Sequence, residues 1–191
     1  MRSRAPTAEV KRSDRVSGWQ IRVGRGVVTF PMKSATARRV RYAQGYAELG
    51  LFREAENELD GIEPTECANP GVLVVRVTLH WEAKQWEQLV AFAGALARAA
   101  PQEEKGWIAW AFALRELGRI ADARAVLLEA EPIHGRTSAV LHYNLGCYHC
   151  LLGEFEAARK RLHTAFRLHP PFKAEAGQDR DLEAMWAEFE A

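Results

Sequence analysis

A turn signal recurs along this chain at a nearly constant interval. It falls at Gly50, Lys84, Gly118 and Gly153, so successive turns lie 34, 34 and 35 residues apart. Each turn is preceded by a small residue with a large residue three positions later, and it is followed by a second apolar run with helical spacing. A period of this length is typical of stacked helix-turn-helix units and predicts a solenoid over residues 32–170.

The residues inside each unit repeat as well. In the fourth unit, Leu145 and Gly146 are followed by a small residue at Ala158 and a closing proline at Pro170. This arrangement resembles the tetratricopeptide repeat, a 34-residue helix-turn-helix unit. Two other units keep its positions less completely: Ala43, Tyr46, Ala55 and Leu59 in the first, and Trp107, Ala111, Ala123 and Leu127 in the third. The second unit is the most divergent: it retains the closing proline, Pro101, but has Arg76, Val77, Leu89 and Ala93 at the other positions and Lys84 at the turn. The resemblance implies an all-α fold, a right-handed α-α superhelix.

Two further regions flank the four helix pairs. After the pairs, residues 171–191 carry an apolar stripe at helical spacing, made of Leu182, Met185, Trp186 and Phe189. We expect one helix there that caps the last unit, because that unit's apolar face would otherwise be exposed. Before the pairs, residues 1–31 have no helical period, and the stretch VSGWQIRVGRGVVTF is at best hairpin-forming or extended. We therefore expect a poorly ordered basic arm, or a non-native extension that precedes Met32.

Basic residues gather in front of the repeats. Residues 1–41 carry 11 Lys and Arg against 2 Asp and Glu, a net charge of +9, whereas residues 42–191 carry 15 against 23, a net charge of −8. The chain is 48% hydrophobic and 27% charged, and no segment approaches a secretory signal or the roughly 20 apolar residues of a membrane span. Three cysteines are too few for a disulfide framework. We expect a cytoplasmic protein.

The concave side of such a superhelix is lined by one face of the first helix of every unit. Each residue turns by about 100° along a helix, so three positions per unit share this face. They are Val40, Gln44 and Ala47; Val74, Thr78 and Trp81; Ile108, Phe112 and Arg115; and Tyr143, Cys147 and Cys150. Most are apolar or aromatic, which predicts a groove for a partner's helix or extended peptide. Trp81, Phe112 and Arg115 are residue types that often anchor interfaces, with packing between units as the alternative role.

The function predicted from these features is non-enzymatic binding of a protein or peptide, as a scaffold, adaptor or chaperone-like module. Some tetratricopeptide proteins clamp a partner's C-terminal carboxylate with Lys and Asn. Lys105 falls on one such position, but Val40, Val75 and Ala109 occupy others, so the clamp is not formed. The chain has no phosphate-binding loop, nucleophile motif or paired catalytic carboxylates, and we expect no cofactor and no small-molecule substrate.

Two alternatives come from other classes of protein. Cys147 and Cys150 could belong to a thiol or metal site, but they lie mid-helix, where the backbone N–H groups that would activate a thiol are already bonded. A zinc site needs about four converging ligands, and Phe112 and Arg115 on the neighbouring helix are not ligands. We therefore expect packing residues and no metal. The second alternative is nucleic-acid contact through the basic arm, which carries one Trp and one Phe and no recognisable nucleic-acid fold.

Overall fold

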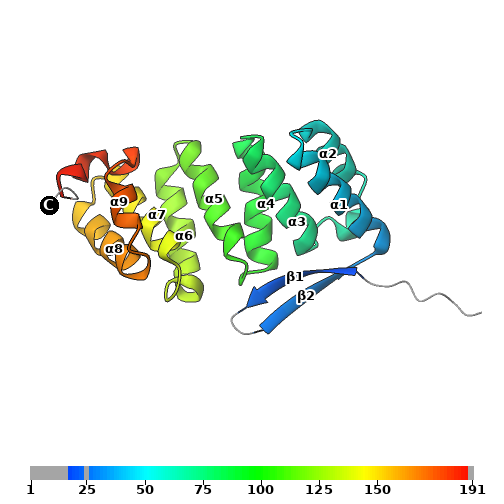
Figure 1. Cartoon of the computed structure of the whole chain (residues 1–191), viewed down its shortest axis with the longest axis horizontal. Helices are drawn as coiled ribbons and strands as arrows, with labels where there is room; N and C mark the ends of the chain where they lie inside the picture. The colour runs from blue at the N-terminus through cyan, green and yellow to red at the C-terminus, as the bar shows by residue number, and fades with distance from the viewer. Residues whose placement is uncertain (1–16, 24–25, 189–191) are drawn as a thin grey trace, which may run out of the picture.

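Four antiparallel helix pairs stack side by side in the computed structural model, which describes residues 17–23 and 26–188 (Figure 1). The pairs are α1 (Ser34–Glu48) with α2 (Phe52–Asp60), α3 (Pro70–Glu82) with α4 (Trp86–Ala99), α5 (Glu104–Glu116) with α6 (Ile120–His134), and α7 (Ala139–Leu151) with α8 (Phe155–Leu168). A short 3-10 turn, η1 (Pro64–Glu66), links the first two pairs. The predicted tetratricopeptide-like superhelix is confirmed.

The recurring turn signal marks a left-handed residue in every helix pair. Gly50, Gly118 and Gly153 have φ values of 73°, 74° and 75°, and Lys84 adopts the same region at 54°. In the first turn the N–H of Gly50 donates to the carbonyl of Ala47, and the next N–H returns to Tyr46, which satisfies the end of α1. Only glycine takes this conformation without strain, so three of the four turns use it.

Small residues allow the two helices of the first, third and fourth pairs to approach closely. Ala43 and Ala55 face each other fully buried in the first pair, as do Ala111 and Ala123 in the third. At Gly146 an added Cβ would lie 2.7 Å from the side chain of Leu162 on α8, closer than van der Waals contact allows. The small positions of the repeat are therefore set by helix packing.

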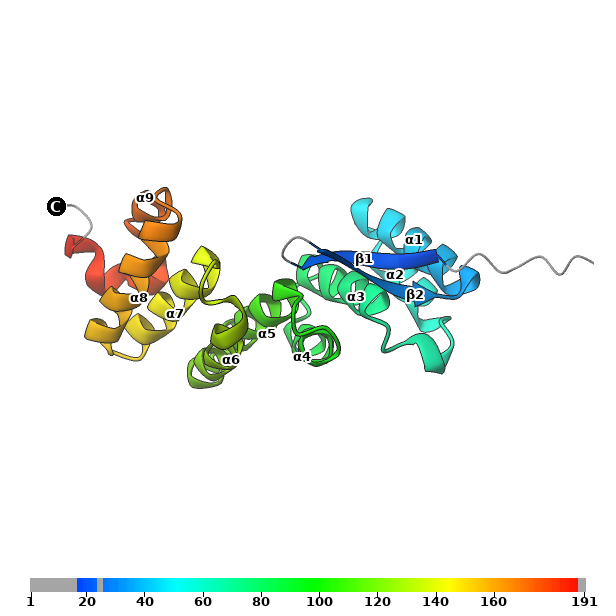
Figure 2. The ribbon, with the colours of Figure 1, turned by 90° about the horizontal axis from the view of Figure 1, so that it is seen from below.

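The N-terminal region differs from the poorly ordered arm that was expected. Strands β1 (Ser17–Val23) and β2 (Gly26–Met32) pair antiparallel, with Ser17 opposite Met32, and run along the ends of α1 and α3 (Figures 1 and 2). Phe30 packs against the apolar cluster of α3, and Asn69 donates a 2.8 Å hydrogen bond to the carbonyl of Pro31. Strands β1 and β2 are thus docked on the repeats, while residues 1–16 lie outside the described part.

The C-terminal region also differs from the single capping helix that was expected. It forms a short helix, α9 (Phe172–Ala176), and a 3-10 segment, η2 (Arg180–Glu188). The side chains of Leu182 and Met185 are fully buried in the core of the last two pairs, so the segment does cover the end of the stack. Phe189, the last residue of the predicted stripe, lies outside the described residues. Within the described residues, no helix is both long and apolar enough to cross a membrane.

Candidate peptide-binding groove

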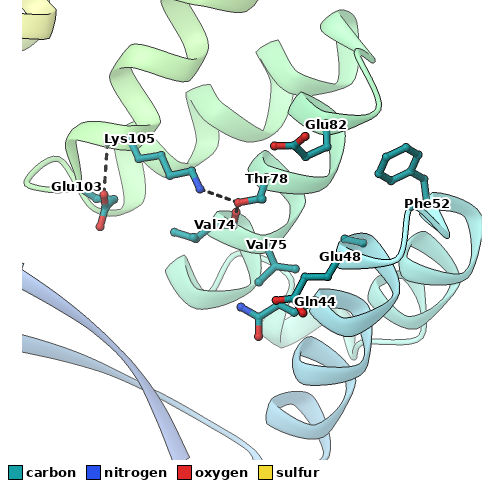
Figure 3. Close-up of a pocket in the computed structure, with 11 residues that line it drawn as sticks. Gln44, Glu48, Phe52, Val74, Val75, Thr78, Glu82, Glu103 and Lys105 are labelled. Carbon is teal, nitrogen blue, oxygen red and sulfur yellow. Dashed lines mark hydrogen bonds between the residues drawn. The ribbon is translucent and has the colours of Figure 1, made fainter.

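An open cavity of about 700 Å³ lies between α1, α3 and the start of α5 (Figure 3). Its lining combines apolar side chains, two neutral polar groups, three carboxylates and one lysine: Ala47, Gly50, Phe52, Val74 and Val75; Gln44 and Thr78; Glu48, Glu82 and Glu103; and Lys105. A second hollow of about 220 Å³ adjoins it along Trp81 and Ile108. Together they form a surface for an extended or helical segment.

Lys105 is held across the cavity by Thr78. Its Nζ donates a 2.6 Å hydrogen bond to Thr78 Oγ1, which in turn donates to the carbonyl of Val74 at 3.0 Å (Figure 3). Partial burial lowers the pKa of Lys105, while the neighbouring carboxylates of Glu103 and Glu82 oppose that shift. The hydrogen bond from the Lys105 ammonium group to Thr78 therefore joins the start of α5 to α3 along one side of the cavity.

The rings of Trp81 on α3 and Phe112 on α5 pack against each other between the two helices. Their rings stack with centroids 4.4 Å apart, and Trp86 meets Phe112 edge-on at 5.8 Å. Both predicted anchors are half-buried by each other, so they stabilise the stacking of the second and third pairs. Trp81 keeps one edge in the smaller hollow, where a ligand can still touch it.

The C-terminal half of the predicted groove is covered by the chain itself. Arg115 Nε donates a 2.8 Å hydrogen bond to Asp181, and the guanidinium also pairs with Glu116, so these acids raise the pKa of Arg115. Asp179 accepts a 2.9 Å hydrogen bond from the hydroxyl of Tyr143. The α9–η2 segment therefore occupies the face of α5 and α7 where a partner was predicted.

The structure brings together about half of the predicted groove residues. Gln44, Val74, Thr78 and Lys105 line the main cavity, and Trp81 and Ile108 line the hollow beside it. Five others are not available in this structure. Val40 is a buried core residue of the first pair, and Phe112 packs against Trp81 and Trp86. Tyr143 and Cys147 lie beneath the C-terminal segment, which also engages Arg115.

Six residues of the cavity lining were not predicted as groove residues, namely Glu48, Gly50, Phe52, Val75, Glu82 and Glu103. Glu48 and Glu82 are 34 residues apart and follow directly after the groove positions Ala47 and Trp81. Their common position in the repeat was the signal that could have found them. Phe52 begins the second helix of its pair, outside the face that was considered.

The side chains that could together hold a metal ion differ from the pair that was considered, Cys147 and Cys150. Cys147 Sγ, Asp179 and Asp181 offer ligand atoms within 4.8 Å of one another. Burial raises the pKa of Cys147 well above its usual range, and Asp179 adds to the shift, so the thiol keeps its proton. Both carboxylates already accept hydrogen bonds, from Tyr143 and Arg115. The two carboxylates of this cluster therefore attach the C-terminal segment to α5 and α7.

Solved structures with this architecture are tetratricopeptide solenoids. MamA from Desulfovibrio magneticus superposes with a TM-score of 0.67 at 18% identity, covering 83% of this chain and 92% of that one. A thermophilic tetratricopeptide protein of Thermus thermophilus gives 0.59 at 18%, covering 81% and 85%. YrrB, a tetratricopeptide protein with an unusual peptide-binding site, gives 0.63 at 10%, covering 80% and 76%. At these identities the likeness shows the fold alone.

The sequence itself matches one protein family over most of its length. That family is described as the N-terminal domain of EccA1, a protein of the ESX-1 type VII secretion system, and the match spans residues 8–182. The chain belongs to this family. No curated protein matches it significantly. The family match and the solved structures together establish a tetratricopeptide-type module of the EccA1 N-terminal family, a fold whose solenoids bind other proteins or peptides.

Proposed function

We propose that this chain binds a segment of a partner protein in the cavity between α1, α3 and α5, as a non-enzymatic adaptor or chaperone-like module. The observation that supports this proposal is the difference between the covered and the open part of the groove. The part that α9 and η2 cover is filled by Leu182 and Met185, while the N-terminal part stays open over about 700 Å³. A volume of that size accommodates several side chains of a peptide.

The lining supports a peptide rather than a small polar metabolite. Apolar contact area comes from Phe52, Val74 and Val75, and hydrogen-bonding groups come from Gln44 and Thr78. This mixture of apolar surface and a few placed polar groups suits side chains presented by a helix or an extended strand. The family description makes a component of a type VII secretion system the favoured partner, and the cytoplasm, predicted from the cysteine usage, the favoured location.

A cavity-filling variant tests the proposal. Gln44→Trp places an indole into the cavity, while the matched control Gln88→Trp adds the same group to the exposed face of α4. Both baits are used to recover proteins from a lysate of the source cells, with circular dichroism as the folding check. We expect a protein that the wild type and the control recover and that Gln44→Trp loses. Recovery of the same proteins by all three baits would contradict the proposal.

A further inference from the structure

Three carboxylates occupy the same position in the repeat. Glu48, Glu82 and Glu116 are spaced by 34 residues, and each is the last residue of the first helix of its pair, at the ends of α1, α3 and α5. A helix C-terminus carries partial negative charge on its unpaired carbonyl groups, so an acidic side chain there is electrostatically unfavourable. A cation beside such a side chain would offset this unfavourable interaction.

In the third pair the chain supplies that cation. The guanidinium of Arg115 pairs with Glu116 and also holds Asp181 of the C-terminal segment. The same repeat position in the first and second pairs is occupied by Ala47 and Trp81, which carry no charge. In the third pair a guanidinium therefore lies at the end of the first helix, where it pairs with the repeated carboxylate, Glu116.

Among the residues that the structure describes, no guanidinium pairs with the first two carboxylates, although Glu82 interacts electrostatically with Lys105. Within the described part of the chain, the side chains of Glu48 and Glu82 form no ion pair or hydrogen bond, whereas Glu58, Glu131 and Glu154 each pair with an arginine. Both line the open cavity, and the one lysine in its lining, Lys105, is already hydrogen-bonded to Thr78. The three acids and one base of the lining leave this part of the groove negatively charged.

We propose that the partner segment carries an arginine or lysine side chain that seats between Glu48 and Glu82, next to an apolar side chain packed on Phe52 and Val75. This inference rests on the proposed function, since it names the chemistry of the segment that the cavity binds. The ligand's cation takes the place at the first two pairs that Arg115 takes at the third. A cation in this cavity is attracted by both carboxylates, which line it, and by the partial negative charge at the ends of α1 and α3.

Two synthetic peptides test the inference by fluorescence anisotropy against the full chain. Both are twelve residues long and contain Ala, Gln and Leu; one carries two Arg and the other carries two Glu at the same positions. We expect the Arg peptide to bind at least about tenfold more tightly than the Glu peptide, with an affinity that falls as salt is added. In Glu48→Gln/Glu82→Gln we expect the Arg peptide to lose at least about tenfold in affinity.

A matched variant separates the cavity from overall charge. Glu54→Gln/Glu87→Gln removes two exposed carboxylates from the starts of α2 and α4, outside the cavity, and should bind the Arg peptide like the wild type. Equal loss in both double variants, equal binding of the two peptides, or no binding of the Arg peptide would each overturn the inference. A Glu peptide that binds the wild type but not Gln44→Trp would overturn it and leave the proposed function standing. Binding of either peptide that Gln44→Trp leaves unchanged would count against the groove itself.

Discussion

The two halves of the groove are formed by the same repeat, but one half is open and the other is covered. At the α1–α3 end, Gln44 and Thr78 line an open cavity. At the α7 end, Cys147 occupies the equivalent repeat position, but it lies beneath Asp179 and is 3% exposed. The difference arises from the C-terminal segment, which folds back over α7 and reaches Arg115 on α5.

This comparison shows that a repeat position does not have a fixed role. The helix face that binds a ligand in one unit becomes an internal interface in another when a segment outside the repeats covers it. The covered half also shows which chemistry the face accepts, namely an apolar side chain such as Leu182 beside a charged pair such as Arg115 and Asp181.

The largest effect on stability is expected from shortening a side chain that fills the covered half of the groove. Leu182→Ala removes a fully buried side chain of η2 and should lower the free energy of unfolding by about 2–4 kcal/mol. Urea unfolding measures the loss, and alkylation of Cys147, followed by mass spectrometry, should become faster as the segment loosens. The exposed neighbour Ala184→Gly serves as the control and should leave Cys147 protected. Unchanged alkylation in Leu182→Ala would mean that the segment does not depend on this anchor.

The next effect concerns the ion pair that joins η2 to α5. Asp181→Asn should cost about 1–3 kcal/mol, because it leaves the partly buried guanidinium of Arg115 with a weaker acceptor. In Arg115→Met/Asp181→Leu the cost should be smaller than the sum of the two single changes, since both charges leave together. Urea unfolding of the wild type, Arg115→Met, Asp181→Leu and the double variant gives the coupling energy of the pair. If the free-energy costs of the two single changes add up to that of the double variant, the ion pair does not help to hold the segment over this half.

The hairpin that borders the open half depends on Asn69. Its side-chain oxygen accepts from the N–H of Gly71 at the start of α3, and its amide donates to Pro31 of β2. Asn69→Ala removes the helix cap and the hairpin contact together and should cost about 1–2 kcal/mol. Asn69→Ser keeps a capping oxygen and loses the contact to Pro31, so its thermal shift should be smaller. A larger shift for Asn69→Ser would contradict this division of roles.

The smallest effect is an acid sensitivity located between α6 and α8. Arg161 holds the pKa of Glu131 below its usual range, mainly by hydrogen bonding. Because the pKa is lowered in the folded chain, the stabilisation is present above about pH 4.5 and is lost as the pH falls through the folded value. Glu131→Gln should reduce stability at pH 7 by at most about 1 kcal/mol and flatten this acid limb. An unchanged acid limb in urea titrations from pH 7 to pH 3 would rule the pair out as its cause.

Much of the fold was predictable because the repeat determines it locally. The left-handed turns at Gly50, Gly118 and Gly153 and the small packing residues gave the period, the helix pairs and the direction of the groove. The sequence indicated at best a hairpin-forming or extended stretch before the repeats and a capping helix after them. The docking of the hairpin and the division of the C-terminal segment were not predicted, because both lie outside the repeat. Their positions depend on long-range contacts such as Asn69 to Pro31 and Arg115 to Asp181. The site was half predictable for the same reason: helical periodicity selects a face, and only the folded chain shows which part of that face is covered.

The most direct test of the account is to ask which half of the groove touches a partner in a lysate of the source cells. A photoreactive benzoylphenylalanine is placed at Gln44, in the open cavity, or at Ala184, on the exposed side of the C-terminal segment. After irradiation, adducts are identified by mass spectrometry. If the open cavity binds the partner, Gln44 gives a defined protein adduct and Ala184 gives none of that protein. An adduct formed from Ala184 alone would place binding at the covered half and contradict binding in the open cavity.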